Sequence, residues 1–116
     1  MSPRYIRWSD TPAASVKKTN ELESFLDSCH DDELLNRANN AFDELEHNYE
    51  RGHKVEKDRW PQYYKENWGI NNLYVIELGR NSRLTYALVS EVGITALCLE
   101  ILTHREYNKR FGYKMN

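Results

Sequence analysis

Leu73-Tyr-Val-Ile-Glu-Leu78 is followed by the turn residues Gly79-Arg-Asn-Ser82 and then by Arg83-Leu-Thr-Tyr-Ala-Leu-Val89. After a second break at residues 90–93, Ile94-Thr-Ala-Leu-Cys-Leu-Glu-Ile-Leu102 forms a third apolar run. The three runs are rich in residues that fit a pleated surface, and the breaks between them are typical of tight turns. The pattern predicts an antiparallel meander of three strands.

Alternation along each expected strand assigns its side chains to two faces. One face collects the larger apolar side chains, and the other collects small, polar or charged ones. We therefore expect a sheet that is covered on one face and open on the other. The expected covered face carries Tyr74, Ile76, Leu78, Leu84, Tyr86, Leu88, Leu97, Leu99 and Ile101, and the expected open face carries Leu73, Val75, Glu77, Arg83, Thr85, Ala87, Ala96, Cys98 and Glu100.

The first half of the chain predicts an αα-hairpin. From Ala13 the pattern is helical, and the break at residues 30–32 offers Asp31 or Asp32 as the cap of a second helix, which Arg51-Gly52 ends. Apolar residues recur at helical spacing in both segments. These stripes are Leu22, Phe25, Leu26 and Cys29 in the first segment, and Leu35, Ala38, Phe42, Leu45 and Tyr49 in the second.

The remaining segments are shorter. Arg4–Trp8 has the alternation of a short strand, and residues 53–72 are too rich in Trp and Tyr for a disordered linker, so we expect an ordered loop with one helical turn. Thr103 is placed to cap a short terminal helix that runs through Arg110. The fold class is therefore α+β: one domain, residues 1–116, in which an N-terminal αα-hairpin packs on one face of a small antiparallel sheet.

Charge is distributed unevenly along the chain. The net charge of −2 argues against a generic polyanion binder, but residues 103–116 carry four Lys and Arg against one Glu. Cys29 and Cys98 match no metal-site spacing and are expected to be reduced thiols of a cytoplasmic protein. The sequence contains neither a secretory signal pattern nor an apolar run of membrane-spanning length.

One group of histidines and acids lies close together in the sequence and is a candidate set of metal ligands. The nearby side chains match no metal-binding spacing and are interpreted as solvated residues of a helix surface. They are Glu44, Glu46, His47 and His53.

A second group of polar residues converges on the expected open face. Glu77 and Arg83 fall on adjacent strands, and the segment containing His104 and Tyr107 begins where the third strand ends. An acid, a cation, a histidine and a tyrosine suit attack of a ribose 2′-hydroxyl on its own phosphate, which needs a base, positive charge and an acid. A simple cross-strand ion pair explains Glu77 and Arg83 equally well. Further cations nearby are Arg80, Arg105, Lys109 and Arg110.

The order of these segments resembles the RelE/ParE superfamily of toxin–antitoxin toxins. The resemblance covers about residues 22–113, and its most recognisable part is the strand that begins Arg83-Leu-Thr-Tyr86. It implies two helices packed on a curved antiparallel sheet. It also implies cleavage of mRNA on the ribosome without a metal or cofactor, and inactivation by a cognate antitoxin.

The resemblance also implies roles for particular residues. Arg83 matches the arginine of the RelE/YoeB-type members, Glu77 an acid on the preceding strand, and His104 or Tyr107 the C-terminal proton-transfer group. The four nearby cations, Arg80, Arg105, Lys109 and Arg110, would then bind RNA phosphates. We expect neither membrane association nor DNA binding by the chain alone.

Two other functions fit the same resemblance. Some members inhibit DNA gyrase by protein contact and lack nuclease residues, so the fold alone does not determine activity. The acidic segment at residues 21–60, with twelve acids against five Lys and Arg, favours a third alternative, a catalytically silent protein–protein interaction module.

Overall fold

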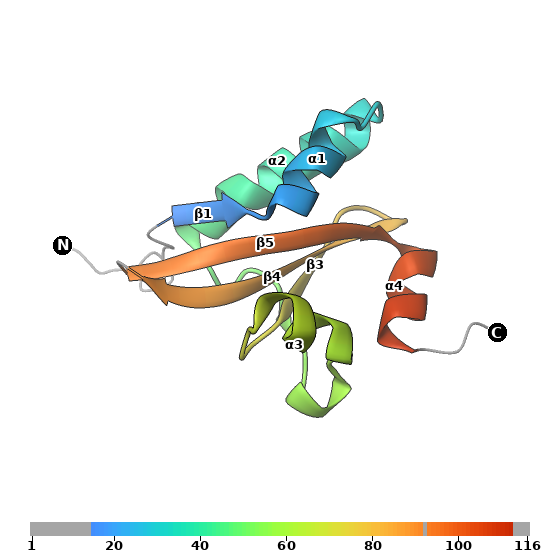
Figure 1. The fold of residues 1–116 in the computed structure, drawn as a ribbon. Coiled ribbons are helices and arrows are strands. Elements are labelled where there is room, and N and C mark those ends of the chain that lie inside the picture. The colour runs from blue at the N-terminus through green and yellow to red at the C-terminus, as the bar shows by residue number, and fades with distance from the viewer. Residues whose placement is uncertain (1–14, 92, 113–116) are drawn as a thin grey trace.

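The computed structural model describes residues 15–91 and 93–112 as an α+β fold in which helices lie on both faces of a five-stranded sheet (Figure 1). No helix in the described part of the chain is long and apolar enough to cross a bilayer. The elements are β1 (Ser15–Lys18), α1 (Asn20–Asp27), α2 (Asp32–His47), β2 (His53–Lys54), the 3-10 helix η2 (Lys57–Arg59), α3 (Gln62–Trp68), β3 (Tyr74–Glu77), β4 (Ser82–Glu91), β5 (Gly93–Thr103) and α4 (His104–Phe111).

The sheet has the strand order β1-β5-β4-β3-β2. The predicted meander is confirmed, because β3 pairs antiparallel with β4 and β4 pairs antiparallel with β5. The prediction of a purely antiparallel sheet is wrong, since β1 runs parallel to β5 at one edge and the two-residue β2 adds the other edge. The sheet is therefore mixed and open.

The N-terminal part of the predicted hairpin is also corrected. Residues 15–18 form a strand rather than helix, and Thr19 caps α1 by accepting a hydrogen bond from the Leu22 backbone N–H at 3.1 Å. Pairing with β5 outweighs the local helical pattern, because it satisfies backbone groups that a helix N-terminus would leave free. The hairpin thus follows a strand, and the expected strand at residues 4–8 lies outside the described residues.

The second helix of the hairpin is shorter than expected. Asp31 caps α2, as one of the two proposed residues, but the helix ends at His47 instead of Arg51-Gly52. The helix ends early because a tertiary contact holds the backbone after it. The Tyr86 hydroxyl accepts a hydrogen bond from the Gly52 N–H and donates one to the Tyr49 carbonyl, both at 2.9 Å. A strand residue therefore binds the backbone that follows the helix.

Both faces of the sheet are covered, which corrects the expectation of one open face. The helices α1 and α2 cover one face, and α3 lies against the other (Figure 1). Burying a second apolar surface explains why the aromatic segment folds into α3 instead of remaining a loop. The core on the α3 side consists of Trp60, Tyr64, Ile70, Leu73, Ala87, Leu99 and Phe111.

Four face assignments on β5 are also corrected. Ala96 and Cys98 lie in the core beneath α1 and α2, whereas Leu99 lies in the core beneath α3 and Leu97 packs against that same core. A register shift in the β4–β5 pairing, at Thr85/Tyr86, leaves Leu99 without a directly paired residue and so interrupts the alternation. Ile101 is then on the α1/α2 side, as expected.

Phe42 tests the α2 packing. Its ring is 6% exposed in the core between α2 and the sheet, so Phe42→Ala should lower the free energy of unfolding by about 3–5 kcal/mol. The control is Phe25→Ala, since Phe25 is an exposed ring on α1 and its loss should cost about 0.5 kcal/mol or less. Urea denaturation followed by circular dichroism measures both, and equal losses would contradict the packing.

Candidate functional site

The β3–β4 turn brings the predicted site residues together. Glu77 and Arg83 are directly paired across the two strands, so their side chains lie on the same face. The Leu78 N–H donates to the Ser82 carbonyl at 2.8 Å and closes the turn. The backbone N–H of His104 donates to the Asn81 carbonyl at 2.7 Å, which holds the start of α4 against the same turn.

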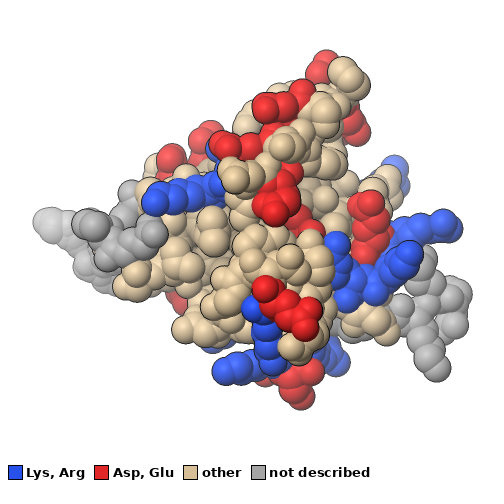
Figure 2. Space-filling view, viewed as in Figure 1, with Lys and Arg blue, Asp and Glu red and all other residues tan. Residues whose placement is uncertain are grey.

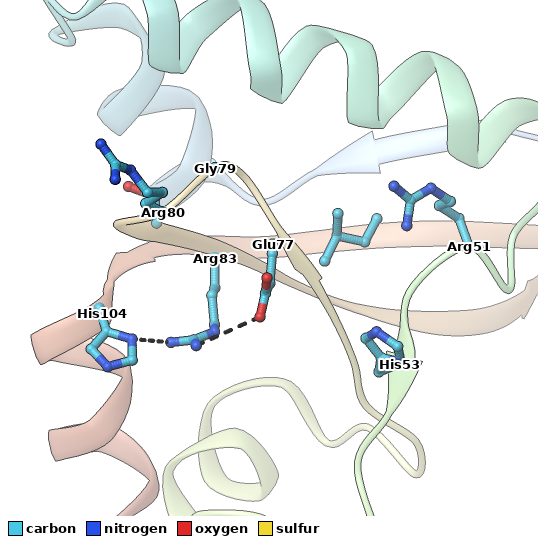
Figure 3. Close-up of a pocket in the computed structure, with 9 residues that line it drawn as sticks. Arg51, His53, Glu77, Gly79, Arg80, Arg83 and His104 are labelled. Atoms are coloured by element: carbon cyan, nitrogen blue, oxygen red, sulfur yellow. Dashed lines mark hydrogen bonds and ion pairs between the residues drawn. The ribbon is translucent and has the colours of Figure 1, made fainter.

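Arg83 is the centre of this arrangement (Figure 3). Its guanidinium lies 2.7 Å from His104 Nδ1 and 3.7 Å from Glu77 Oε2, and it lies 4.6 Å from the centroid of the Tyr107 ring. The Arg83 side chain is 20% exposed, whereas that of Glu77 is 66% exposed. The guanidinium is therefore held on three sides and keeps access to solvent.

The contact with Arg83 determines which ring nitrogen of His104 carries a proton. A guanidinium can only donate hydrogen bonds, so His104 Nδ1 must accept the bond from Arg83. The proton of the neutral imidazole is therefore on Nε2. An anion that draws the guanidinium away from His104 leaves the Nδ1 lone pair free to take a proton.

A cleft of about 770 Å³ opens beside Arg83, and we call it the central cleft. His53 lines it together with His104, and in Figure 3 the two imidazoles lie on opposite sides of the Arg83–Glu77 pair. The cleft combines several cations with only one carboxylate. Its lining is Arg51, His53, Ile76, Glu77, Gly79, Arg80, Ser82, Arg83 and His104.

His53 is the site residue that sequence reasoning missed. Its sequence neighbours suggest a helix surface, but His53 lies on β2, where it pairs with Val75 of β3. A two-residue edge strand has no periodic signal, so nothing local in the sequence could have placed His53 beside Arg83. The pairing of β2 with β3 alone brings it there.

The four predicted phosphate-binding cations are placed differently from one another. Arg80 lines the central cleft. Arg105 and Lys109 are exposed on α4, and neither is among the described residues that line the cleft. Arg110 is turned away to Glu100, with a 2.8 Å ion pair, and stacks at 3.6 Å on the Tyr63 ring. The geometry thus supports Arg80 as a cleft cation and gives Arg110 a structural contact.

Glu100 connects three elements beneath α4. Its Oε2 accepts from the Tyr64 hydroxyl of α3 at 2.5 Å and from Arg110 of α4 at 2.8 Å, and its side chain is only 13% exposed. Burial raises the pKa of Tyr64 far above its ordinary value, and the Glu100 carboxylate raises it further, so the hydroxyl remains a donor. This network anchors the helix that carries His104 and Tyr107.

The charge of the surface is divided between the two ends of the fold. Residues 20–47, which include α1 and α2, carry nine Asp and Glu against Arg37 alone. Figure 2 shows these acids gathered over the two helices, with Lys and Arg side chains near α4. Among the described residues, no group of three His, Cys, Asp or Glu side chains is placed to hold a metal ion.

Glu100 tests the anchoring of α4. Glu100→Ala leaves the Arg110 guanidinium without its carboxylate and should lower the free energy of unfolding by roughly 3 kcal/mol, the scale for breaking a buried pair. Adding Arg110→Ala should restore part of that loss. Glu66→Gln on the exposed face of α3 is the control. Chemical denaturation is the measurement, and a Glu100→Ala protein as stable as the control would contradict the anchor.

Comparison with known proteins does not extend this description. No protein-family model, curated protein or solved structure matches the chain.

Proposed function

We propose that this protein is a metal-independent endoribonuclease that cleaves mRNA on the ribosome. In this proposal it is the toxin of a toxin–antitoxin pair of the RelE/ParE type. The single observation that carries the proposal is the position of Arg83, which is hydrogen-bonded to His104 and lines a cation-rich cleft together with His53.

A phosphate of the RNA binds to the Arg83 guanidinium. Arginine suits this role because its donors match the oxygens of a phosphate, and its charge stabilises the extra negative charge of the transition state. Tyr107 lies under the guanidinium and keeps it oriented by a cation–π contact. Glu77, on the neighbouring strand β3, lies on the solvent-exposed side and forms an ion pair with the second terminal nitrogen of the guanidinium.

The 2′-oxygen attacks phosphorus, and the bond from phosphorus to the 5′-oxygen of the next nucleotide breaks. The products are a 2′,3′-cyclic phosphate and a free 5′-hydroxyl, and no water is consumed. In-line attack requires the base and the acid on opposite sides of the phosphorus. In Figure 3 His104 and His53 lie on opposite sides of the Arg83–Glu77 pair, to which the phosphate would bind in this proposal. His104 Nδ1, freed when Arg83 binds phosphate, takes the 2′-hydroxyl proton. Protonated His53 gives a proton to the leaving 5′-oxygen.

The chain's own residues supply the base, the positive charge and the acid in this scheme, so the reaction needs no metal or cofactor. The cognate antitoxin inhibits the protein by covering the central cleft. An acidic segment of that antitoxin would complement the cations Arg51, Arg80 and Arg83, which line the cleft.

A second candidate function is a catalytically silent interaction module. The observation that favours it is the acidic surface of α1 and α2, which the catalytic proposal does not use. A gyrase inhibitor of the ParE type has no comparable support from the described residues. The experiment on Arg83 separates the three candidates.

Arg83→Ala tests the proposed function directly. It should change the free energy of unfolding by about 1 kcal/mol or less, because a partly exposed ion pair contributes little. It should lower RNA cleavage by roughly a hundredfold or more, the scale for losing a preorganised donor to a developing charge. Lys65→Ala, which removes an exposed cation of α3 outside the cleft, is the matched control and should retain cleavage.

The measurement is induced expression followed by mapping of mRNA 5′ ends on ribosomes, repeated in vitro with EDTA. Codon-phased cuts that Arg83→Ala abolishes support the nuclease. DNA damage without such cuts indicates gyrase inhibition. Neither effect, with the protein folded, indicates the interaction module.

A substrate with a better leaving group separates the proposed roles of the two histidines, His53 as acid and His104 as base. A substrate with sulfur in place of the bridging 5′-oxygen needs no acid, because a thiolate leaves readily. His53→Ala and His104→Ala should each slow cleavage of ordinary RNA by roughly 10²–10⁴-fold. The sulfur substrate should restore cleavage to His53→Ala and not to His104→Ala. Rescue of His104→Ala alone would reverse the two roles, and unimpaired cleavage by both variants would remove them.

A further inference from the structure

The central cleft adjoins two smaller depressions, each of which shares lining residues with it. The first, of about 300 Å³, lies on the α4 side and shares His53, Glu77 and Arg83 with the central cleft. The second, of about 250 Å³, lies between the β3–β4 turn and the start of α2 and shares Gly79, Arg80 and Ser82 with it. We call this second depression the turn-side pocket. We call the three adjoining depressions, which border the β3–β4 turn, the groove.

Cations are spaced along the whole groove. Lys54 and Arg59 line its α4 end, Arg83 its middle, and Arg80 the junction with the turn-side pocket. Figure 3 shows Arg80 extending away from the Arg83–Glu77 pair, on the other side of the turn. A row of cations in a groove suits the phosphates of a single strand. The strand would continue past Arg83 to Arg80.

The turn-side pocket itself has a different chemistry. Glu33 and Asp31 line it, and carboxylates accept hydrogen bonds but repel phosphate. Arg37 forms its wall, held by a 2.8 Å ion pair to Glu33 and packed against Gly79, where an added Cβ would lie 2.9 Å from the guanidinium. A polar pocket with acceptors, next to a phosphate path, suits the base of a nucleotide.

We propose that the turn-side pocket is a subsite for the base of a nucleotide that flanks the scissile phosphate. Guanine fits it best, because its N1–H and N2–H₂ groups donate side by side to one carboxylate, whereas uracil presents a single donor at its N3–H. Glu33 is the specificity-determining residue, and the substrate is a single strand of at least three nucleotides. This inference rests on the proposed function.

The test measures binding, so it does not depend on cleavage. Oligonucleotides with 2′-O-methyl groups resist cleavage, and their affinities are measured by NMR titration of the ¹⁵N-labelled protein. A dinucleotide is compared with trinucleotides that carry an added guanosine or uridine at either end. One guanosine trinucleotide should bind about tenfold more tightly than its uridine counterpart. Its titration should shift the backbone signals of Arg37 and Asn81.

Glu33→Gln should remove the preference for guanosine and leave dinucleotide affinity unchanged. The matched control is Glu23→Gln on α1, another exposed acid, which lines none of the three depressions and should retain the preference. Equal affinities for the two trinucleotides, or a preference that survives Glu33→Gln, would overturn the subsite. If the subsite is overturned in this way but the wild-type protein still cleaves RNA, the proposed function stands without the subsite. Absence of both binding and cleavage overturns the two together.

Discussion

The antiparallel pairing of β4 with β5 is the interaction on which the rest of the structure depends. The two longest strands form the middle of the sheet, β1 adds to one side of the pair and β3 to the other. β5 contributes apolar side chains to both faces, and the register shift near Leu99 returns Ile101 to the α1/α2 side. Two helical layers can then cover the sheet, because each buries a separate core and neither competes for the same side chains.

The same pairing explains where the candidate site lies. Ser82 pairs with Thr103, so α4 begins beside the strand that carries Arg83. Thr103 starts this helix with a capping box, in which its hydroxyl accepts from the Glu106 N–H and the Glu106 carboxylate accepts from the Thr103 N–H. The Glu100 network then holds the far end of the helix. His104 is thus fixed by both ends of α4 and by the turn.

Much of this arrangement could be predicted from local pattern. Short-range rules of alternation, turns and capping predict the β3–β4–β5 meander and the closeness of Glu77 and Arg83 to α4. They also predict a cap at Thr103 and one at Asp31 or Asp32, of which the structure uses Asp31. Each rule concerns residues a few positions apart, where the backbone itself sets the geometry. The predicted roles of Glu77, Arg83, His104 and Tyr107 remain predictions that the geometry supports.

The sequence by itself therefore determined the meander, the cap residues and the pairing of Glu77 with Arg83. Only the tertiary structure decided three features. These are the parallel pairing of β1 with β5, the exchange of faces at Leu99, and the position of His53 beside the cleft. The first and third join segments that are far apart in the chain, and the second depends on a bulge. Such features depend on which distant surfaces are buried together, and the local periodicity of the sequence carries no information about that.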